Sequence, residues 1–256
     1  MSALHLRQWP GAEGRPALAL HCMMGNASYW GPVAGKLRDL VQVAAPDLPG
    51  HGASPDWTGE PADYHSHVTR LVAPLITRPL DLIGHSLGAT VALRIAVAAP
   101  EAVRSLTLIE PVLFAAAPDP RNDEIMDGIE ALARTGRKDE AARRFISIWG
   151  GVPWERQSEA GQARLARQID MVIAGNDALM RDSANILRPG GLEGIDAPVM
   201  ILMGGNSPAA IPAIAQALAA RLPDVGRATL PDAGHMLPIT HPAQVAELIR
   251  LNLERA

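Results

Sequence analysis

Short apolar runs that alternate with helical patterns constrain the fold of this chain more than any other feature. Six runs of about four to six residues are bounded by Gly, Pro or Asp: 17–22, 41–46, 80–84, 104–109, 198–203 and 227–230. Such runs are typical of central strands in a parallel sheet, which are buried on both faces. Helical patterns lie between them at 33–40, 62–77, 87–99, 209–222 and 241–254. The alternation predicts a doubly wound α/β fold with helices on both faces of the sheet.

The alternation stops between about residues 114 and 195, where no strand pattern is found. Helical spacing there predicts helices at 122–135, 137–149 and 155–181, with breaks at Pro118, Pro120 and Pro153. An insertion of roughly 80 residues is too long to be a plain crossover. We therefore predict a core of residues 1–113 and 196–256, and a helical cap of residues 114–195 that covers one edge of the sheet and roofs a pocket.

Composition and charge exclude several classes of protein. Residues of the set AVILMFWYC make up 48% of the 256 residues, which is far too apolar for a disordered chain. The formal net charge of −4 provides no basic field, so we expect no nucleic-acid partner. No run approaches the ~18 apolar residues of a membrane span, and residues 1–16 lack the apolar block of a signal peptide. We expect a cytoplasmic protein without a membrane span, and its oligomeric state is left open.

The sequence gives no support for a metal or cofactor. Cys22 is the single cysteine, which excludes an internal disulfide and a multi-cysteine metal site. His65 and His67 form an H-x-H pattern on a predicted helix, but no carboxylate or cysteine cluster accompanies it. We interpret both histidines as part of a solvated face and expect a site with neither metal nor cofactor.

The segment Gly84-His85-Ser86-Leu87-Gly88 lies between a predicted strand and a predicted helix. This is the G-x-S-x-G pattern, in which glycines permit a sharp strand-to-helix turn. The turn lifts the serine hydroxyl above the sheet edge at a helix N-terminus, where developing negative charge is favoured. The pattern makes Ser86 the candidate nucleophile.

A serine hydroxyl becomes a good nucleophile only when a base takes its proton. His235 follows the last predicted strand and is expected at the same sheet edge as Ser86. His51 lies in a glycine-containing loop and His241 at a helix start, so both fit this role less well. We therefore predict His235 as the base.

The segment 21–26, which follows the first predicted strand, is the candidate oxyanion loop. Acyl transfer needs two backbone N–H groups directed at the tetrahedral oxyanion. One comes from the residue after the nucleophile, here Leu87, and the other from the loop after an early strand, here Met23. Because these roles belong to the backbone, the side chains of Met23 and Leu87 contribute little to them.

These segments together resemble the α/β-hydrolase family along nearly the whole chain. The resemblance is carried, in order, by segment 21–26, the loop 47–54, the elbow 84–88 and the pair Gly234-His235. It implies an eight-stranded, mostly parallel sheet with a helical cap inserted after the strand that follows the elbow. The loop 47–54 is a family landmark that we interpret as a tight turn without a catalytic role.

The chain departs from the family at two positions. Cys22 stands where the family usually has glycine, and we interpret it as a small buried residue, with a reactive thiol as the alternative. The turn that usually carries the family's acid holds Ser207, which has no charge. We place the acid at Glu110, which ends the strand 104–109 at the same sheet edge as Ser86. Some family members are similar, because their acid also follows this strand.

Other interpretations of the acid stay open at this point. Glu110 could instead pair with an arginine of the cap, such as Arg121 or Arg134. Asp232 lies only three residues before the predicted base and fits a turn better. Asp196 precedes its strand and therefore lies at the wrong edge of the sheet.

The residues and the resemblance together predict a cofactor-free serine hydrolase. We expect it to act on a small, fairly apolar ester, thioester or lactone through an acyl-enzyme, because the cap carries the apolar residues Phe145, Ile148, Trp149, Trp154 and Met171. One alternative is a carbon–carbon bond hydrolase, lyase or perhydrolase with the same triad. Another is a ligand-binding or signalling protein on a hydrolase scaffold, which the uncharged Ser207 would favour.

Overall fold

Seven strands form one sheet in the computed structural model, which describes residues 4–60 and 62–256. In sheet order they are β1 (Leu6–Trp9), β3 (Gln42–Pro46), β2 (Pro16–Leu20), β4 (Leu80–His85), β5 (Val103–Ile109), β6 (Val199–Gly204) and β7 (Val225–Leu230). β1 pairs antiparallel with β3, and the other neighbours are parallel. The predicted α/β class and mostly parallel sheet are confirmed, and the six predicted strands correspond to β2 through β7.

The described residues contain seven strands rather than the eight that the resemblance implies. One antiparallel strand, β1, lies beyond β3 at the edge of the sheet. The apolar runs do not indicate β1, because three of its four residues are exposed. An edge strand with solvated side chains needs only backbone pairing, so hydrophobic patterning leaves no trace of it.

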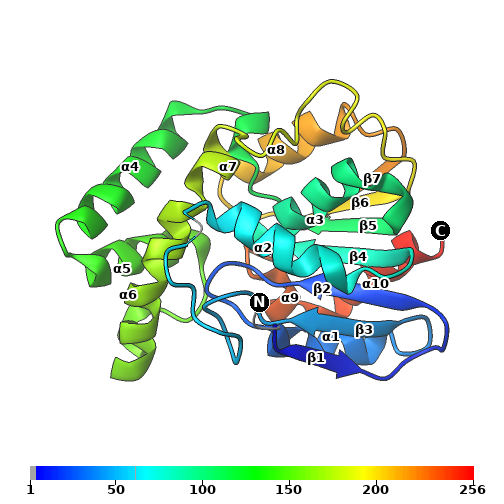
Figure 1. Ribbon diagram of the computed structural model, residues 1–256, viewed down its shortest axis with the longest axis horizontal. Helices are drawn as coiled ribbons and strands as arrows, with labels where there is room; N and C mark the ends of the chain where they lie inside the picture. The colour runs from blue at the N-terminus through cyan, green and yellow to red at the C-terminus, as the bar shows by residue number, and fades with distance from the viewer. Residues whose placement is uncertain (1–3, 61) are drawn as a thin grey trace.

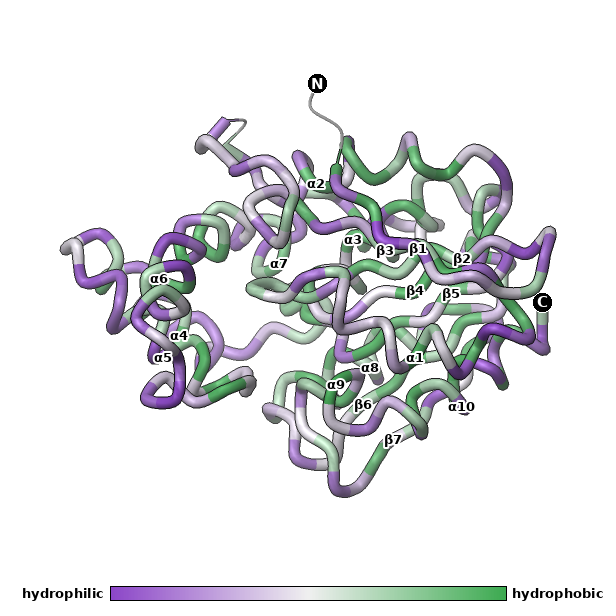
Figure 2. The backbone as a smooth tube through the Cα atoms, turned by 90° about the horizontal axis from the view of Figure 1, so that it is seen from below, coloured by the Kyte–Doolittle hydropathy of each residue, from purple (hydrophilic) through white to green (hydrophobic). Residues whose placement is uncertain are grey.

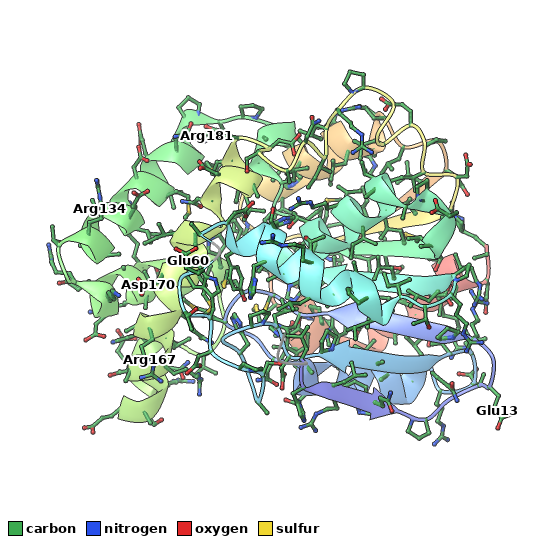
Figure 3. All side chains as sticks on the ribbon, in the orientation of Figure 1. Glu13, Glu60, Arg134, Arg167, Asp170 and Arg181 are labelled. Carbon is green, nitrogen blue, oxygen red and sulfur yellow. The ribbon has the colours of Figure 1, made fainter. Side chains whose placement is uncertain are left out.

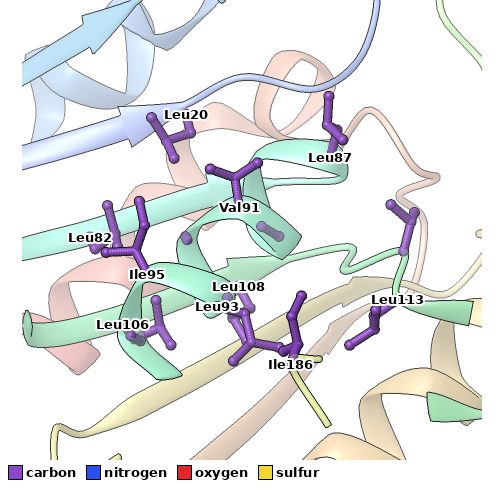
Figure 4. Close-up of a cluster of buried hydrophobic side chains, with 14 of the residues drawn as sticks. Leu20, Leu82, Leu87, Val91, Leu93, Ile95, Leu106, Leu108, Leu113 and Ile186 are labelled. Carbon is purple, nitrogen blue, oxygen red and sulfur yellow. The ribbon is translucent and has the colours of Figure 1, made fainter. Parts of the chain in front are cut away.

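Helices cover both faces of the sheet (Figure 1). On one face, α2 (Tyr64–Val72), α3 (Leu87–Ala98) and α8 (Ala210–Ala219) bury apolar side chains in one cluster with β4 and β5. On the other face lie α1 (Gly31–Lys36), α9 (Leu237–Thr240) and α10 (Pro242–Leu253). Figure 4 shows the first cluster, in which Val91, Leu93 and Ile95 of α3 lie against Leu82, Leu106 and Leu108 of the strands.

Residues 114–195, here called the helical insertion, contain α-helices and no strand. These helices are α4 (Pro120–Arg134), α5 (Lys138–Trp149), α6 (Glu159–Ala174) and α7 (Asn176–Met180). The side chains of Asp119 and Ser158 cap the N-termini of α4 and α6 by accepting backbone N–H groups. The expected single helix over 155–181 is wrong, because the Ser158 cap starts α6 late and Gly175 separates it from α7.

The helical insertion lies beside the sheet, with α4, α5 and α6 farthest from it (Figure 1). Figure 2 shows long hydrophilic stretches along these helices. Charged residues of the insertion, labelled in Figure 3, are exposed on its outer side: Arg134, Arg167, Asp170 and Arg181. Among the described residues, no helix is both long and apolar enough to span a membrane.

The carboxyl ends of β4, β5 and β6 meet at one edge of the sheet. The ladder continues past the strands, because the Ser86 N–H donates to the Ile109 carbonyl at 2.9 Å and the Glu110 N–H to the Leu202 carbonyl at 2.8 Å. These two bonds fix the residues that follow β4 and β5 side by side.

Candidate active site

Ser86 lies in a sharp turn between β4 and α3. Its backbone angles are φ 56° and ψ −117°, a conformation that L-residues rarely adopt outside strained functional turns. A Cβ at Gly84 would lie 2.3 Å from the Gly88 carbonyl oxygen, and a Cβ at Gly88 would lie 2.4 Å from the Leu20 carbonyl oxygen. The first and last residues of the elbow, Gly84 and Gly88, must therefore be glycine. The turn that they permit presents the Ser86 side chain at the sheet edge.

Ser86, His235 and Glu110 form a continuous hydrogen-bonded chain. His235 Nε2 lies 3.0 Å from Ser86 Oγ, and His235 Nδ1 lies 2.9 Å from Glu110 Oε2. An ionised carboxylate only accepts hydrogen bonds, so Nδ1 donates to it and the Nε2 lone pair faces the serine hydroxyl. All three side chains are buried. The sequence-predicted nucleophile and acid are therefore both within hydrogen-bond distance of the predicted base, which is in the tautomer that lets His235 accept a proton from Ser86.

Both oxygens of Glu110 are engaged. Oε1 accepts the Gly204 N–H at 2.6 Å, while Oε2 accepts from His235. Glu110 is fully buried, and its φ of 52° directs the chain away from the end of β5. Met24, Ser86 and Glu110 are among the five non-glycine residues of the described chain with positive φ. Backbone strain is thus concentrated at this edge of the sheet, as is common at functional sites.

The other candidates for the acid and for its partner lie elsewhere. Arg121 and Arg134 pair with carboxylates in or beside α4 rather than with Glu110. Asp196 and Asp232 are exposed. Ser207, at the position of the family's usual acid, is partly buried, and its Oγ has no hydrogen-bond partner among the described residues.

The backbone N–H groups of Met23 and Leu87 are free to bind an oxyanion. Neither has a hydrogen-bond acceptor among the described residues. Leu87 opens α3, and the first N–H groups of a helix have no intrahelical acceptor. The next N–H in the oxyanion loop, that of Met24, is already bound to His51 Nε2 at 2.9 Å. Met23 and Leu87 line the same cavity as Ser86, as a pair of oxyanion donors must.

Two cavities meet at Ser86. The smaller has a volume of about 40 Å³ and is lined mainly by apolar side chains, among them Phe114, Met126 and Val172. The larger has a volume of about 250 Å³, and His235 and Arg164 lie on its wall. Phe145 and Trp149 of α5 line both cavities, as do Met23 and Ser86, so the insertion forms part of the wall that the two cavities share. The Trp149 ring meets the His235 imidazole edge-on, with centroids 4.9 Å apart.

Known proteins provide an independent line of comparison. The sequence profile of the alpha/beta hydrolase family matches residues 17–248. The chain belongs to the alpha/beta hydrolase family. This hydrolase is 30% identical to pimeloyl-[acyl-carrier protein] methyl ester esterase of Methylococcus capsulatus, over 93% of this chain and 94% of that protein. It is 28% identical to a lipase of Mycobacterium tuberculosis, over 98% of this chain and 97% of that one.

A solved structure also matches the fold of this hydrolase. An alpha/beta hydrolase enzyme from a Medee basin deep-sea metagenome library superposes with a TM-score of 0.82, covering 99% of this chain and 94% of that one at 16% identity. At this identity the likeness concerns the fold. The family resemblance inferred from four short motifs is confirmed, and the protein is an enzyme of the hydrolase class.

The segment 21–26 of this hydrolase, the candidate oxyanion loop, is held in place by residues to which the motifs assign no role. His51 Nδ1 donates to a backbone carbonyl of its own loop, which leaves Nε2 free to accept the Met24 N–H. The Asp47 carboxylate accepts the N–H groups of Ala27 and Ala53. The loop 47–54 is therefore more than a tight turn, because it holds the segment that carries Met23. Its partners lie some 20 to 27 residues away, so no local sequence signal reveals them.

Cys22 and His65 are both buried, and neither is placed to act as a nucleophile or as a metal ligand. Cys22 is buried, and burial raises the pKa of its thiol to about 12, so the thiol is protonated and not a nucleophile near neutral pH. The interpretation of His65 as part of a solvated face is wrong, because α2 buries it against Thr90 Oγ1 at 3.2 Å and Arg94 Nη1 at 3.2 Å. No cluster of three or more His, Cys, Asp or Glu in the described residues is placed to hold a metal.

Four buried histidines should make this hydrolase sensitive to acid. Burial lowers the pKa of His21 to about 3, of His51 to about 4 and of His65 to about 4, and it holds the pKa of His85 well below the usual value. Each is neutral in the folded state but binds a proton near pH 6.5 when unfolded. The stability they contribute is therefore complete above about pH 6.5 and is lost as the pH falls toward their folded pKa values.

The unfolding free energy should fall steeply as the pH is lowered. Near pH 5 the unfolding free energy falls by about 1.4 kcal/mol per pH unit for each of His21, His51 and His65, so these three together cost about 4 kcal/mol per unit, and His85 acts in the same direction. Because typical domains have only about 5–15 kcal/mol in total, we expect acid unfolding near pH 5. Urea titrations between pH 4.5 and 8 measure this slope. An unfolding free energy that changes by less than about 1 kcal/mol between pH 7 and pH 5 would contradict it.

Proposed function

We propose that the protein hydrolyses small, fairly apolar esters, thioesters or lactones through an acyl-enzyme on Ser86, without a cofactor. The observation that carries this proposal is the hydrogen-bonded chain of Ser86, His235 and Glu110 beside two free N–H groups and an apolar cavity. The names of the relatives, an esterase and a lipase, agree with ester substrates. No carboxylate of the described residues lines either cavity, which suits an uncharged acyl group.

Acylation begins when Ser86 Oγ attacks the substrate carbonyl carbon while His235 Nε2 takes the hydroxyl proton. The Met23 and Leu87 N–H groups stabilise the negative charge that develops on the carbonyl oxygen. Glu110 stabilises the imidazolium of His235 through Nδ1. The tetrahedral intermediate then collapses, the bond to the leaving group breaks, and His235 gives its proton to the departing alcohol or thiol.

Deacylation repeats these steps with water as the nucleophile. His235 takes a proton from the water, the new oxygen bonds to the acyl carbon, and the same N–H groups hold the oxyanion. Collapse of this intermediate releases the carboxylic acid and returns the proton to Ser86 Oγ. Each residue therefore ends the cycle in its starting state.

The position of His235 assigns the two halves of the substrate. The leaving group must receive a proton from His235 Nε2, and His235 lines the larger cavity but not the smaller one. We therefore place the leaving group and the incoming water in the larger cavity and the acyl chain in the smaller. The guanidinium of Arg164 on the wall of the larger cavity disfavours a cationic leaving group.

The small volume of the acyl cavity limits chain length. A cavity of about 40 Å³ suits short chains, and longer ones must displace side chains of the insertion. Met126 and Ile129, one turn apart on α4, are both buried in the core of the insertion, but only Met126 of the two lines this cavity. Met126→Ala should raise kcat/KM for octanoate relative to butanoate esters by about tenfold or more, because each accommodated methylene contributes ~0.8 kcal/mol.

Ile129→Ala is the matched control, because it also removes a buried side chain from α4 without enlarging the acyl cavity. We expect Ile129→Ala to leave the octanoate-to-butanoate ratio unchanged. The ratio is measured as kcat/KM for a series of nitrophenyl esters. An equal change in both variants would mean that general loosening of the insertion, rather than cavity size, sets chain length.

Turnover of a nitrophenyl butanoate by the wild-type protein tests the proposed function directly. An esterase cycles many times per active site, whereas a binding or signalling protein stops after one stoichiometric burst. Labelling with a fluorophosphonate, followed by peptide mapping, should find the label on Ser86. Absence of turnover, or a label on another residue, would overturn the proposal. Diketone and peracid assays on the same preparation test the carbon–carbon hydrolase and perhydrolase alternatives.

A further inference from the structure

We propose that Tyr29 and His85 are positioning residues that hold the backbone of His235 and the oxyanion loop in register with Ser86. The proposal rests on the proposed function, because it assumes that His235 is the base. Neither residue is part of the hydrogen-bonded chain that reaches the substrate. Both are outside the roles that the sequence motifs assign, although His85 is the second residue of the elbow.

Three hydrogen bonds carry the inference, and together they connect two loops of the site. The Cys22 N–H donates to Tyr29 Oη at 2.9 Å, Tyr29 Oη lies 2.9 Å from His85 Nδ1, and His85 Nε2 lies 2.9 Å from the His235 carbonyl oxygen. Tyr29 belongs to the 3-10 helix η1 (Ala27–Trp30), and His85 is the last residue of β4. Cys22 directly precedes Met23, one of the two oxyanion donors.

The chemistry of the groups fixes the direction of each bond. A carbonyl oxygen only accepts, so His85 Nε2 must carry the proton that reaches His235. His85 is fully buried, and burial keeps its pKa well below the usual range, so the ring is neutral and Nδ1 is an acceptor. The Tyr29 hydroxyl therefore donates to Nδ1 and accepts from the Cys22 N–H. We call these three hydrogen bonds the relay. A single arrangement of protons gives every polar atom in it a hydrogen-bond partner.

The relay links parts of the site that are otherwise far apart in the sequence. His85 is bonded covalently to Ser86, and its ring contacts the His235 ring with centroids 5.2 Å apart. The carbonyl that it holds belongs to a loop 149 residues beyond Ser86. Because a displacement of about 1 Å can cost about 100-fold in rate, a bond that fixes this loop relative to the nucleophile has a catalytic consequence.

Two substitutions of His85 separate its two bonds. The amide nitrogen of glutamine is as many bonds from Cα as imidazole Nε2, so His85→Gln can still donate to the His235 carbonyl. The amide oxygen of asparagine matches Nδ1, so His85→Asn can accept from Tyr29 but cannot reach His235. We expect kcat to fall about 10- to 100-fold in His85→Asn with KM unchanged, and to stay within about fivefold of wild type in His85→Gln.

The test measures kcat, KM and thermal stability for His85→Asn, His85→Gln and Tyr29→Phe. Tyr29→Phe should lower kcat about tenfold or more, because it leaves the Cys22 N–H, next to Met23, without its acceptor. Ser105→Ala is the control, because it loses a buried bond to Asp81 at the opposite edge of the sheet.

The outcomes are distinct. The proposal is supported if kcat stays within about fivefold of wild type in His85→Gln, falls about tenfold or more in His85→Asn, and is unchanged in Ser105→Ala, which loses stability only. An equal fall of kcat in both His85 variants, or wild-type kcat in both, overturns it. If the wild-type protein itself neither turns over esters nor is labelled at Ser86, the proposed function fails instead, and that result is seen before any variant is compared.

Discussion

Replacing Ser86 with alanine should lower kcat for a nitrophenyl ester by about 10⁵- to 10⁶-fold. The substitution removes the oxygen that lies 3.0 Å from His235 Nε2, so no acyl-enzyme can form. The proposed oxyanion donors are backbone N–H groups of Met23 and Leu87, which the substitution leaves in place. A residual rate above that of the reaction in water is therefore expected, of the size seen when other hydrolases lose their nucleophile.

Ser207→Ala is the matched control for Ser86→Ala. Ser207 is the serine at the family's usual acid position, and its Oγ has no hydrogen-bond partner among the described residues. Its removal should leave kcat unchanged, because no bond is lost. Steady-state kinetics of both variants, with circular dichroism to confirm folding, make the comparison. If Ser86→Ala kept more than about a hundredth of wild-type kcat, the acyl-enzyme mechanism would be wrong.

The centre of the fold could be predicted from the sequence because its strands are buried on both faces. β4 and β6 bury every residue, so β6 has the sequence of a continuous apolar run and β4 that of an apolar run interrupted by Asp81. The elbow could be predicted as well, since Gly84 and Gly88 are dictated by backbone contacts that any larger side chain would violate. Where local sterics or burial decide the structure, the sequence carries the information directly.

Long-range contacts decided the features that the sequence did not reveal. β1 is stabilised by pairing with β3 while its side chains face solvent, so no apolar pattern marks it. The same holds for the site, where His51 and Tyr29 act through hydrogen bonds to other loops. A histidine or a tyrosine can lie either at the protein surface or in the core. Only the assembled fold determines which hydrogen bonds these two side chains make.

For Glu110, the sequence predicted one of its two contacts and not the other. Its place after β5 follows from the apolar run, and its approach to His235 follows from the rule that parallel strands end at one edge of the sheet. Its second contact, the Gly204 N–H at 2.6 Å, could not be foreseen, because that group follows from the register of β5 with β6. The sequence thus indicated the partner of the base but not what holds the carboxylate in place.

Replacing Glu110 with glutamine should lower kcat by about 10³- to 10⁴-fold. Glutamine keeps the size of the side chain but has no charge to stabilise the imidazolium of His235. Its NH₂ group can also donate to His235 Nδ1, which would place the ring proton on Nε2 and leave Ser86 without an acceptor. Asp232→Asn is the control, because Asp232 is an exposed carboxylate close to His235 in sequence.

Glu110→Asp separates the charge of the side chain from its reach. Aspartate keeps the negative charge but is one methylene shorter, so it cannot hold both the Gly204 N–H and His235 Nδ1 as Glu110 does. We expect kcat between those of wild type and Glu110→Gln, because the imidazolium is still stabilised by a more distant carboxylate. Kinetics of all three variants at the pH optimum decide the matter. If Glu110→Gln stays within about tenfold of wild type, the site works as a serine–histidine pair or with another acid, and the assignment of Glu110 is wrong.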